Sequence, residues 1–108
     1  MATNTELTKY LPLSEASLYI LLSLTEPRHG YAIMQHVEKI SQGQVTIGPG
    51  TLYGAFSTFE GEKLIEMVSE ENRRKSYILT EKGRQVLALQ ARRLTILHQN
   101  LQAVLNQG

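Results

Sequence analysis

Hydrophobic residues recur at helical spacing through the first half of the chain, which predicts a mainly helical core. The segment Ala16–Leu24, ASLYILLSL, is apolar on nearly all sides. A helix of this kind belongs at the centre of a fold with neighbours all round, and Ser14 is a suitable N-cap for it. A second helix is expected over residues 31–40, after a connection rich in helix breakers. Its buried stripe would be Ile33, Met34, Val37 and Ile40.

The next helix is expected within residues 47–63, where the sequence reads IGPGTLYGAFSTFEGEK. Pro49 suits the first position of a helix, because its fixed φ is already helical and its missing N–H would have no partner there. Each glycine in a helix costs roughly 0.8–1 kcal/mol relative to alanine, so a glycine-rich face needs a reason. Such a smooth face would let either a neighbouring helix of the same fold or the wall of a DNA groove approach the backbone. The face opposite the hydrophobic stripe consists of Gly50, Gly54, Ser57 and Gly61.

After residue 63 the hydrophobic period changes to two, which predicts strands at Leu64–Ser69 and Ser76–Leu79. The polar segment between them, Glu70–Lys75, is expected to form the tip of a β-hairpin. Three adjacent cations, Arg73, Arg74 and Lys75, lie on this tip and the return strand. Two helices separated by a short break and followed by such a hairpin are typical of a winged helix-turn-helix.

The last element is expected to be a helix from Glu81 to about Asn106, with Thr80 as its N-cap. At 1.5 Å per residue it would be about 39 Å long, which is more than the rest of so small a domain could cover. Its hydrophobic stripe needs a second partner, and the simplest is another copy of the chain. The alternative is that the helix packs only onto its own domain. The stripe residues expected to dimerise are Leu87, Leu94, Leu97, Leu101 and Val104.

The predicted fold class is therefore α+β and mostly helical, a winged helix-turn-helix with a long C-terminal dimerisation helix. The 108 residues suffice for one small domain with one core. The absence of cysteine excludes disulfides, and a reducing cytoplasm is the expected setting. The polar N-terminus is unlike a signal peptide, and the apolar run Leu18–Leu24 is too short to span a bilayer, so no membrane partner is expected.

The net charge of +1 conceals an asymmetry. Residues 1–71 carry four cations against nine glutamates, a net charge of −5, whereas residues 72–108 carry seven cations against one glutamate, a net charge of +6. A basic segment of this kind indicates a surface for a polyanion, although a solvated helix face accounts for part of the same signal.

Catalysis is not expected. The chain has no cysteine or aspartate, and its three histidines, His29, His36 and His98, are scattered without metal-ligand spacing. Glu60 and Glu62 would point about 200° apart on a helix, which is wrong for a catalytic carboxylate pair. No cofactor and no metal site are therefore predicted.

Five short segments, taken together and in order, carry a family signature. They are Leu18–Leu21, His29–Tyr31, Pro49–Tyr53, Leu64–Ile65 and Arg74–Gly83. Over roughly residues 10–85 the chain resembles the PadR family of bacterial transcriptional regulators. The resemblance implies a DNA-binding domain over residues 1–80 and, as in the short subfamily, one dimerisation helix over residues 81–108. It also implies a repressor that binds an inverted-repeat operator in double-stranded DNA as a homodimer.

In this family's arrangement, residues 47–63 enter the major groove and the hairpin follows the adjacent backbone or minor groove. The helix has no cation before Lys63, which stands where the family usually has glycine, so the hairpin cations would supply the affinity. Ser76 also departs from the family, where a second aromatic residue is common. The expected DNA-binding residues are Pro49, Gly50, Thr51, Tyr53, Gly54, Ser57, Thr58, Lys63, Arg73, Arg74 and Lys75.

The hydroxyls of Thr51, Ser57 and Thr58 can bond to base edges or phosphates. For Tyr53 a phosphate contact and a buried hydroxyl bonded to backbone both stay open, whereas Tyr31 and Tyr77 are expected to be structural.

The resemblance also allows an effector, since many family members release DNA when a small aromatic or cationic molecule reaches the dimer interface. By analogy, its pocket would lie between the N-terminal helices and the last helix, lined by Tyr10, Tyr19, Met34 or Leu97. The alternative function is a winged helix that binds only protein partners, which the acidic first two-thirds of the chain would tolerate. The three hairpin cations argue against it.

Overall fold

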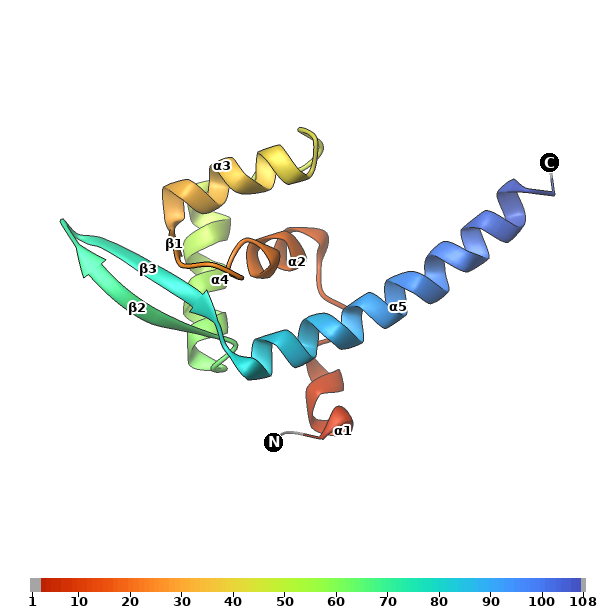
Figure 1. The fold of residues 1–108 in the computed structure, drawn as a ribbon, viewed down its shortest axis with the longest axis horizontal. Coiled ribbons are helices and arrows are strands. Elements are labelled where there is room, and N and C mark those ends of the chain that lie inside the picture. Colours follow the sequence, from red (N-terminus) through yellow and green to blue (C-terminus); the bar gives the residue numbers. More distant parts are fainter. Residues whose placement is uncertain (1–2, 108) are drawn as a thin grey trace.

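The β-hairpin and the C-terminal helix extend in opposite directions from a mainly helical body (Figure 1). The computed structural model describes residues 3–107. In chain order the elements are α1 (Asn4–Leu7) with a 3₁₀ turn (Thr8–Tyr10), α2 (Glu15–Leu22), β1 (Arg28–His29), α3 (Gly30–Ile40), α4 (Pro49–Gly61), β2 (Ile65–Glu71), β3 (Arg74–Leu79) and α5 (Glu81–Leu105).

The starts of three helices follow from their first residues, as expected. Ser14 Oγ accepts the N–H of Ser17 at 3.0 Å at the start of α2, and Thr80 Oγ1 accepts the N–H of Gly83 at 3.1 Å at the start of α5. Pro49 begins α4. Each capping oxygen satisfies an N–H that has no partner within its helix, so both predicted N-caps are confirmed.

The core is built from the end of α1, from α2, α3, α4, the base of the hairpin and the first turns of α5. The predicted hydrophobic stripe of α4 is buried, whereas two other expectations are wrong at the edge of the core. Ile40 is 39% exposed because it is the last residue of α3. Helix α2 is not surrounded: Leu22 is 38% exposed, because a groove between α2 and α5 stays uncovered within the described chain. The buried hydrophobic residues are Leu7, Ile20, Leu21, Leu24, Ile33, Val37, Ile47, Leu52, Phe56, Phe59, Leu64, Ile65, Tyr77, Leu79 and Val86.

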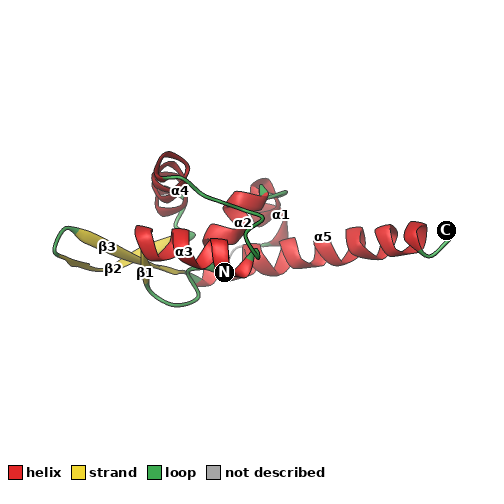
Figure 2. Cartoon of the chain, turned by 90° about the horizontal axis from the view of Figure 1, so that it is seen from above, coloured by secondary structure: helices red, strands yellow, loops and turns green. Residues whose placement is uncertain are grey.

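The hairpin strands are longer, and their turn is tighter, than the sequence indicated. The strands run on to the pair Glu71–Arg74, so the segment predicted to be a polar tip belongs mostly to the ladder. Asn72 and Arg73 form the turn, with φ angles of 53° and 66°. A two-residue turn of type I′ requires positive φ at both positions, and its twist matches that of the strands. Figure 2 shows the resulting hairpin as a narrow ribbon that leaves the core.

The sheet has a third strand that the sequence did not predict. β3 lies between β2 and β1, and both pairings are antiparallel. In β1, Arg28 pairs with Tyr77 and His29 with Ser76. Two residues are too few to leave a strand period in the sequence, so this segment resembled a loop.

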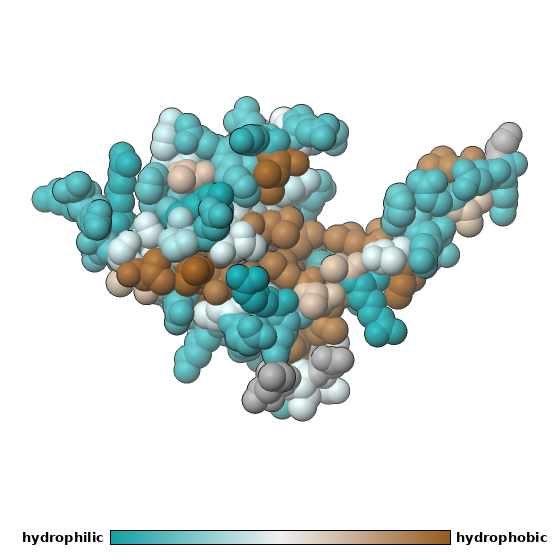
Figure 3. Space-filling view, viewed as in Figure 1, coloured by the Kyte–Doolittle hydropathy of each residue, from teal (hydrophilic) through white to brown (hydrophobic). Residues whose placement is uncertain are grey.

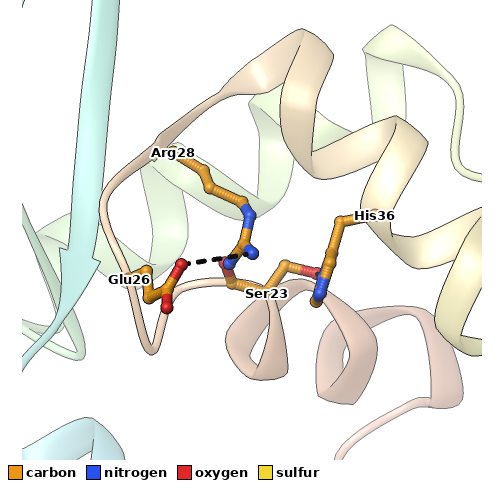
Figure 4. A network of polar contacts seen from close by, with 4 residues as sticks. All are labelled: Ser23, Glu26, Arg28 and His36. Atoms are coloured by element: carbon orange, nitrogen blue, oxygen red, sulfur yellow. Dashed lines mark hydrogen bonds and ion pairs between the residues drawn. The ribbon is translucent and has the colours of Figure 1, made fainter.

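A polar network holds the end of α2 against α3 (Figure 4). Arg28 Nη1 donates to the backbone oxygen of Ser23 at 2.6 Å, and its Nη2 lies 3.6 Å from Glu26 Oε2. Ser23 Oγ donates its one hydrogen to the carbonyl of Tyr19 at 2.9 Å, so the 2.9 Å contact with His36 Nδ1 is a bond that the histidine donates. Burial, then the charges of Arg28 and Lys39, lower the pKa of His36 below its ordinary value.

Helix α5 belongs to the core for its first turns only. Gly83, Val86 and Gln90 are buried, and a Cβ at Gly83 would collide with the backbone oxygen of Leu64, so glycine is needed for this close approach. Gln90 Oε1 accepts the N–H of Leu13 at 2.8 Å. Every residue from 91 to 107 is exposed, which excludes packing onto its own domain for that half of the helix. We call Ala91–Leu105 the arm.

Candidate nucleic-acid interface

The outer face of α4 is open along its whole length. A Cβ built on Gly50, Gly54 or Gly61 would meet no atom within 4 Å. The sequence left open whether another helix of the same fold covers this smooth face, and within residues 3–107 none does. The face is therefore free to receive an external body. Its exposed predicted residues are Pro49, Gly50, Thr51, Tyr53, Gly54, Ser57 and Thr58.

A cleft of about 430 Å³ lies between α4 and the hairpin. From α4 it is lined by Tyr53 and Ser57, and from the hairpin by Arg73, Arg74 and Lys75. The fold thus brings five of the predicted DNA-binding residues to one opening, although they are about 20 positions apart in the chain.

Aromatic rings fix the hairpin against α4 inside this cleft. The ring centroids of Phe56 and Tyr77 lie 4.6 Å apart, with an angle of 36° between the ring planes. The rings of Tyr53 and Phe56 pack edge to face, with centroids 5.9 Å apart and an angle of 76° between their planes. Tyr77 is buried, as expected for a structural residue, whereas Tyr53 is 59% exposed. Because the hairpin base is tied to the helix through these rings, the hairpin cations start from a defined position relative to α4.

The cleft holds negative as well as positive charge. Glu60 of α4 lines it together with the three cations, and Glu70 lies opposite Lys75 in the ladder. Burial, followed by the charges of Glu60 and Glu70, raises the pKa of the Tyr77 hydroxyl. The phenol is therefore neutral at neutral pH and can donate a hydrogen bond.

Lys63, also predicted to bind DNA, lies outside this cleft. It follows the C-terminal end of α4 and adopts a φ of 62°. The family position occupied by glycine thus keeps its left-handed backbone here, with a lysine that is strained by its Cβ.

Six residues that line the cleft were not predicted to belong to it: His29, Gly30, Tyr31, Phe56, Glu60 and Tyr77. Tyr31 was expected to be structural and is instead 59% exposed. The helical period gives the missing signal, because Tyr31 falls on the side of α3 away from the buried Ile33 and Val37. Its proximity to the hairpin, in contrast, depends on the pairing of β1 with β3, which the sequence did not reveal.

A model of the family described as "Transcriptional regulator PadR-like family" matches residues 18–89, which is more than half of the chain. The chain belongs to this PadR-like family. The matched residues include α4, the whole hairpin and the start of α5, so the expected resemblance is confirmed. Since the family consists of transcriptional regulators, the expectation that the chain is not an enzyme is confirmed as well.

Two curated relatives of this PadR-like chain are longer than it is. The chain is 30% identical over 90 residues to "Transcriptional regulator YqjI" of Escherichia coli (strain K12), a match that covers 82% of the chain and 44% of that protein. It is 35% identical over 79 residues to an uncharacterized 37.1 kDa protein in transposon TN4556 of Streptomyces fradiae, covering 72% of the chain and 22% of that protein. The chain therefore spans less than half of either relative.

Solved structures share the PadR-like fold. A transcriptional regulator from Clostridium thermocellum has a TM-score of 0.69 at 17% identity, covering 95% of this chain and 97% of its own. A PadR-like transcription factor from Bacteroides fragilis has a TM-score of 0.64 at 24% identity, covering 82% and 86%. The predicted winged helix-turn-helix with a long last helix is thereby confirmed. Within residues 3–107, no helix combines the length and apolar character needed to cross a membrane.

Two hydrophobic grooves flank α5 where the PadR-like domain gives way to the arm. One, of about 390 Å³, lies between α2 and α5 and includes Leu22 and Leu87; the other, of about 500 Å³, includes Leu13 and Leu97. Leu87 is half-buried and also packs against the core, whereas Leu94, Leu97, Leu101 and Val104 are exposed. Figure 3 shows hydrophobic surface along the C-terminal helix.

Of the residues named for an effector pocket, only Leu97 lines one of these two grooves of the described chain. Leu97 lines the second groove, but Tyr10 donates its hydroxyl to Glu62 at 2.9 Å. Tyr19 and Met34 pack against the hydrophobic core.

Proposed function

We propose that this PadR-like chain is a sequence-specific DNA-binding repressor that reads an inverted repeat as a homodimer. The observation that carries the proposal is the open, uncharged outer face of α4 beside the cations of the hairpin. A helix face that consists mostly of glycines and small hydroxyl residues can approach the floor of a major groove, and neighbouring cations can neutralise phosphates.

The two elements would divide the work. Thr51, Ser57 and Thr58 expose hydroxyls that can bond to base edges, and threonine methyl groups can contact thymine. Arg73, Arg74 and Lys75 would position the duplex through sequence-independent phosphate contacts. The same cations disfavour the alternative of a module that binds only proteins, since three adjacent cations favour a polyanion such as DNA.

A second copy of the chain would cover the hydrophobic side chains of the arm. Monomeric proteins rarely expose a long series of large aliphatic side chains, and here these residues recur along one helix that leaves its own domain. Two α4 helices joined in this way would meet successive major grooves about one helical turn apart.

A small aromatic effector would fit the grooves beside α5 better than a cationic one. Their volumes lie within the range of ligand sites, and their charged lining residues are Arg84 and Arg93. Bound there, it would change how the two copies pack and so release the DNA. A thermal-shift screen with phenolic and cationic aromatic compounds tests this part: a compound that raises the melting temperature and weakens DNA binding supports it, and a screen with no stabilising compound contradicts it.

Selection from random duplexes followed by fluorescence anisotropy at several salt concentrations tests DNA binding. With six to eight phosphate contacts per dimer, the slope of log K against log salt should be about −5 to −7. Arg74→Ala should weaken binding to all duplexes about tenfold or more and flatten the slope by about 2, since each dimer loses two contacts. Thr58→Ala should change sequence preference and leave the salt slope unchanged.

Lys39→Ala is the matched control, because it removes an exposed cation of α3 that lies outside the cleft. The proposal fails if wild type does not bind duplex DNA at low salt, and the assignment of the hairpin fails if Arg74→Ala behaves like Lys39→Ala.

A further inference from the structure

Three side chains join the N-terminal segment, the end of α4 and the start of α5. Tyr10 donates its hydroxyl to Glu62 Oε2 at 2.9 Å. Lys82 Nζ donates to the backbone oxygen of Glu62 at 2.9 Å and also lies 5.1 Å from the centroid of the Tyr10 ring. Glu62 is the C-cap of α4. We call Tyr10, Glu62 and Lys82 the clasp.

Lys82 makes two contacts in the clasp that suit its ammonium group. The last carbonyls of α4 have no partner within the helix and carry partial negative charge, so an ammonium group is attracted to them. The ring of Tyr10 attracts the same ammonium through its π face. Because the clasp is partly exposed to water, its contacts contribute little to the stability of the fold.

The backbone beneath the clasp connects the same two helices. The N–H of Thr80 donates to the oxygen of Leu64 at 3.0 Å, and Thr80 Oγ1 donates to the oxygen of Lys63 at 2.7 Å. The absence of a Cβ at Gly83 lets the first turn of α5 lie directly on Leu64. The start of α5 is thus bound to the residues that directly follow α4, and α5 continues without interruption into the arm.

We infer that the clasp fixes the angle between α4 and α5, so that the arms of a dimer dictate the distance and orientation between its two α4 helices. Tyr10, Glu62 and Lys82 are then positioning residues for operator recognition, although they contact no DNA. The inference rests on the proposed function. The preference for one spacing between half-sites then depends on the contacts between α4 and α5 as well as on the dimer interface.

A dimer in which the angle between α4 and α5 is fixed (a rigid joint) binds two half-sites differently from a dimer in which this angle varies (a loose joint). With a rigid joint, binding of the first α4 places the second at one spacing only, and its effective concentration there is high. A loose joint spreads the second helix over many positions, so the correct spacing binds less tightly and incorrect spacings are tolerated. Binding to an isolated half-site depends on α4 and the hairpin alone, and is the same in both cases.

The test measures binding to four duplexes: the operator selected by wild type, the operator with one or two base pairs inserted between half-sites, and a single half-site. Lys82→Met and Tyr10→Phe should bind the operator about fivefold more weakly, lose most of their preference for its spacing, and bind the single half-site like wild type. Lys9→Met is the matched control. It removes an equal charge that also lies 5.2 Å from the Tyr10 ring, with no bond to α4 among the described residues, and should keep the wild-type spacing profile.

Each outcome is decisive. Spacing profiles of Lys82→Met and Tyr10→Phe that match wild type overturn the inference and leave the proposed function intact. An equal loss on the single half-site and the operator also overturns it, since the clasp would then act on α4 itself. A wild type that does not bind duplex DNA, or binds all spacings equally, overturns the proposed function and with it the inference.

Discussion

Lys63 illustrates how a single backbone conformation constrains the chain. Its φ of 62° places the residue in the left-handed region, which costs an L-residue with a side chain roughly 1–2 kcal/mol. The fold keeps this conformation because both of its backbone groups are bonded: its N–H donates to the oxygen of Glu60 at 3.0 Å, and its oxygen accepts from Thr80. The residue therefore turns the chain from α4 into β2 at the expense of strain.

Lys63→Gly should raise the free energy of unfolding by about 0.5–1 kcal/mol, because relief of strain exceeds the extra entropy of glycine in the unfolded chain. Lys63→Ala removes the same ammonium group without relieving the strain and should not stabilise the protein. Urea denaturation of both variants separates the two effects. If the two variants are equally stable, backbone strain is not what limits this position, and if both bind DNA like wild type, Lys63 makes no phosphate contact.

His36 gives a prediction about pH. Because burial and nearby cations lower its pKa in the folded protein, the unfolded chain binds the proton more tightly. The contribution of His36 to stability is therefore complete above the ordinary value of 6.5 and is lost as the pH falls below it. The charge of Glu26 acts in the opposite direction: it raises the pKa of His36 and offsets part of the lowering that burial beside Ser23 causes.

The melting temperature of wild type should fall between about pH 7.5 and pH 5.5, and it should fall less in His36→Gln, whose neutral amide can still donate to Ser23. His98→Gln, at an exposed position of the arm, should keep the wild-type dependence. Equal pH dependence of His36→Gln and wild type would show that carboxylates alone account for the change.

At the scale of elements, the sequence correctly predicts features that depend on a few neighbouring residues. The caps of α2 and α5, the proline that begins α4 and the smooth outer face of α4 all follow from short-range chemistry, and the structure has them where expected. The extent of the hairpin was underestimated. Charged residues near its turn resembled a loop, but opposite charges facing each other across two strands stabilise the ladder.

What the sequence could not give is the meeting of elements far apart in the chain. In the sequence, the cations of the hairpin are recognisable as a run of charged residues. The smooth outer face of α4 is recognisable as a pattern of glycines. That both line one cleft with Tyr31 depends on the stacking of Phe56 on Tyr77 and on the short strand β1. Neither contact leaves a periodic signal, because each is made by one or two residues that are brought together only in the folded chain.

At the scale of the whole molecule, the domain buries its hydrophobic core, whereas most of the second half of α5 extends beyond the domain and stays exposed. The longest dimension is 55 Å, against 21 Å for the shortest, and the arm accounts for much of this length (Figures 1 and 2). Val104 is 67% exposed, Leu97 55% and Leu101 52%, and burying a leucine or valine side chain contributes about 1.5–3 kcal/mol. These residues therefore contribute little to the stability of one chain and would contribute much to its association.

The double variant Leu97→Glu/Leu101→Glu should be monomeric at micromolar concentration by light scattering, because it places four carboxylates in the proposed dimer interface and removes four leucines from it. Its helical content should match that of wild type, since both positions are exposed in the single chain. The melting temperature of wild type should rise with protein concentration, whereas that of the variant should not. Gln99→Glu adds a carboxylate to the same exposed helix without removing a hydrophobic side chain, and should remain dimeric.

The double variant Leu97→Glu/Leu101→Glu should bind a single half-site like wild type but lose the tighter binding of the full operator, since that gain depends on linking two α4 helices. A variant that is still dimeric would instead place the interface in the groove between α2 and α5 alone, with the arm left free.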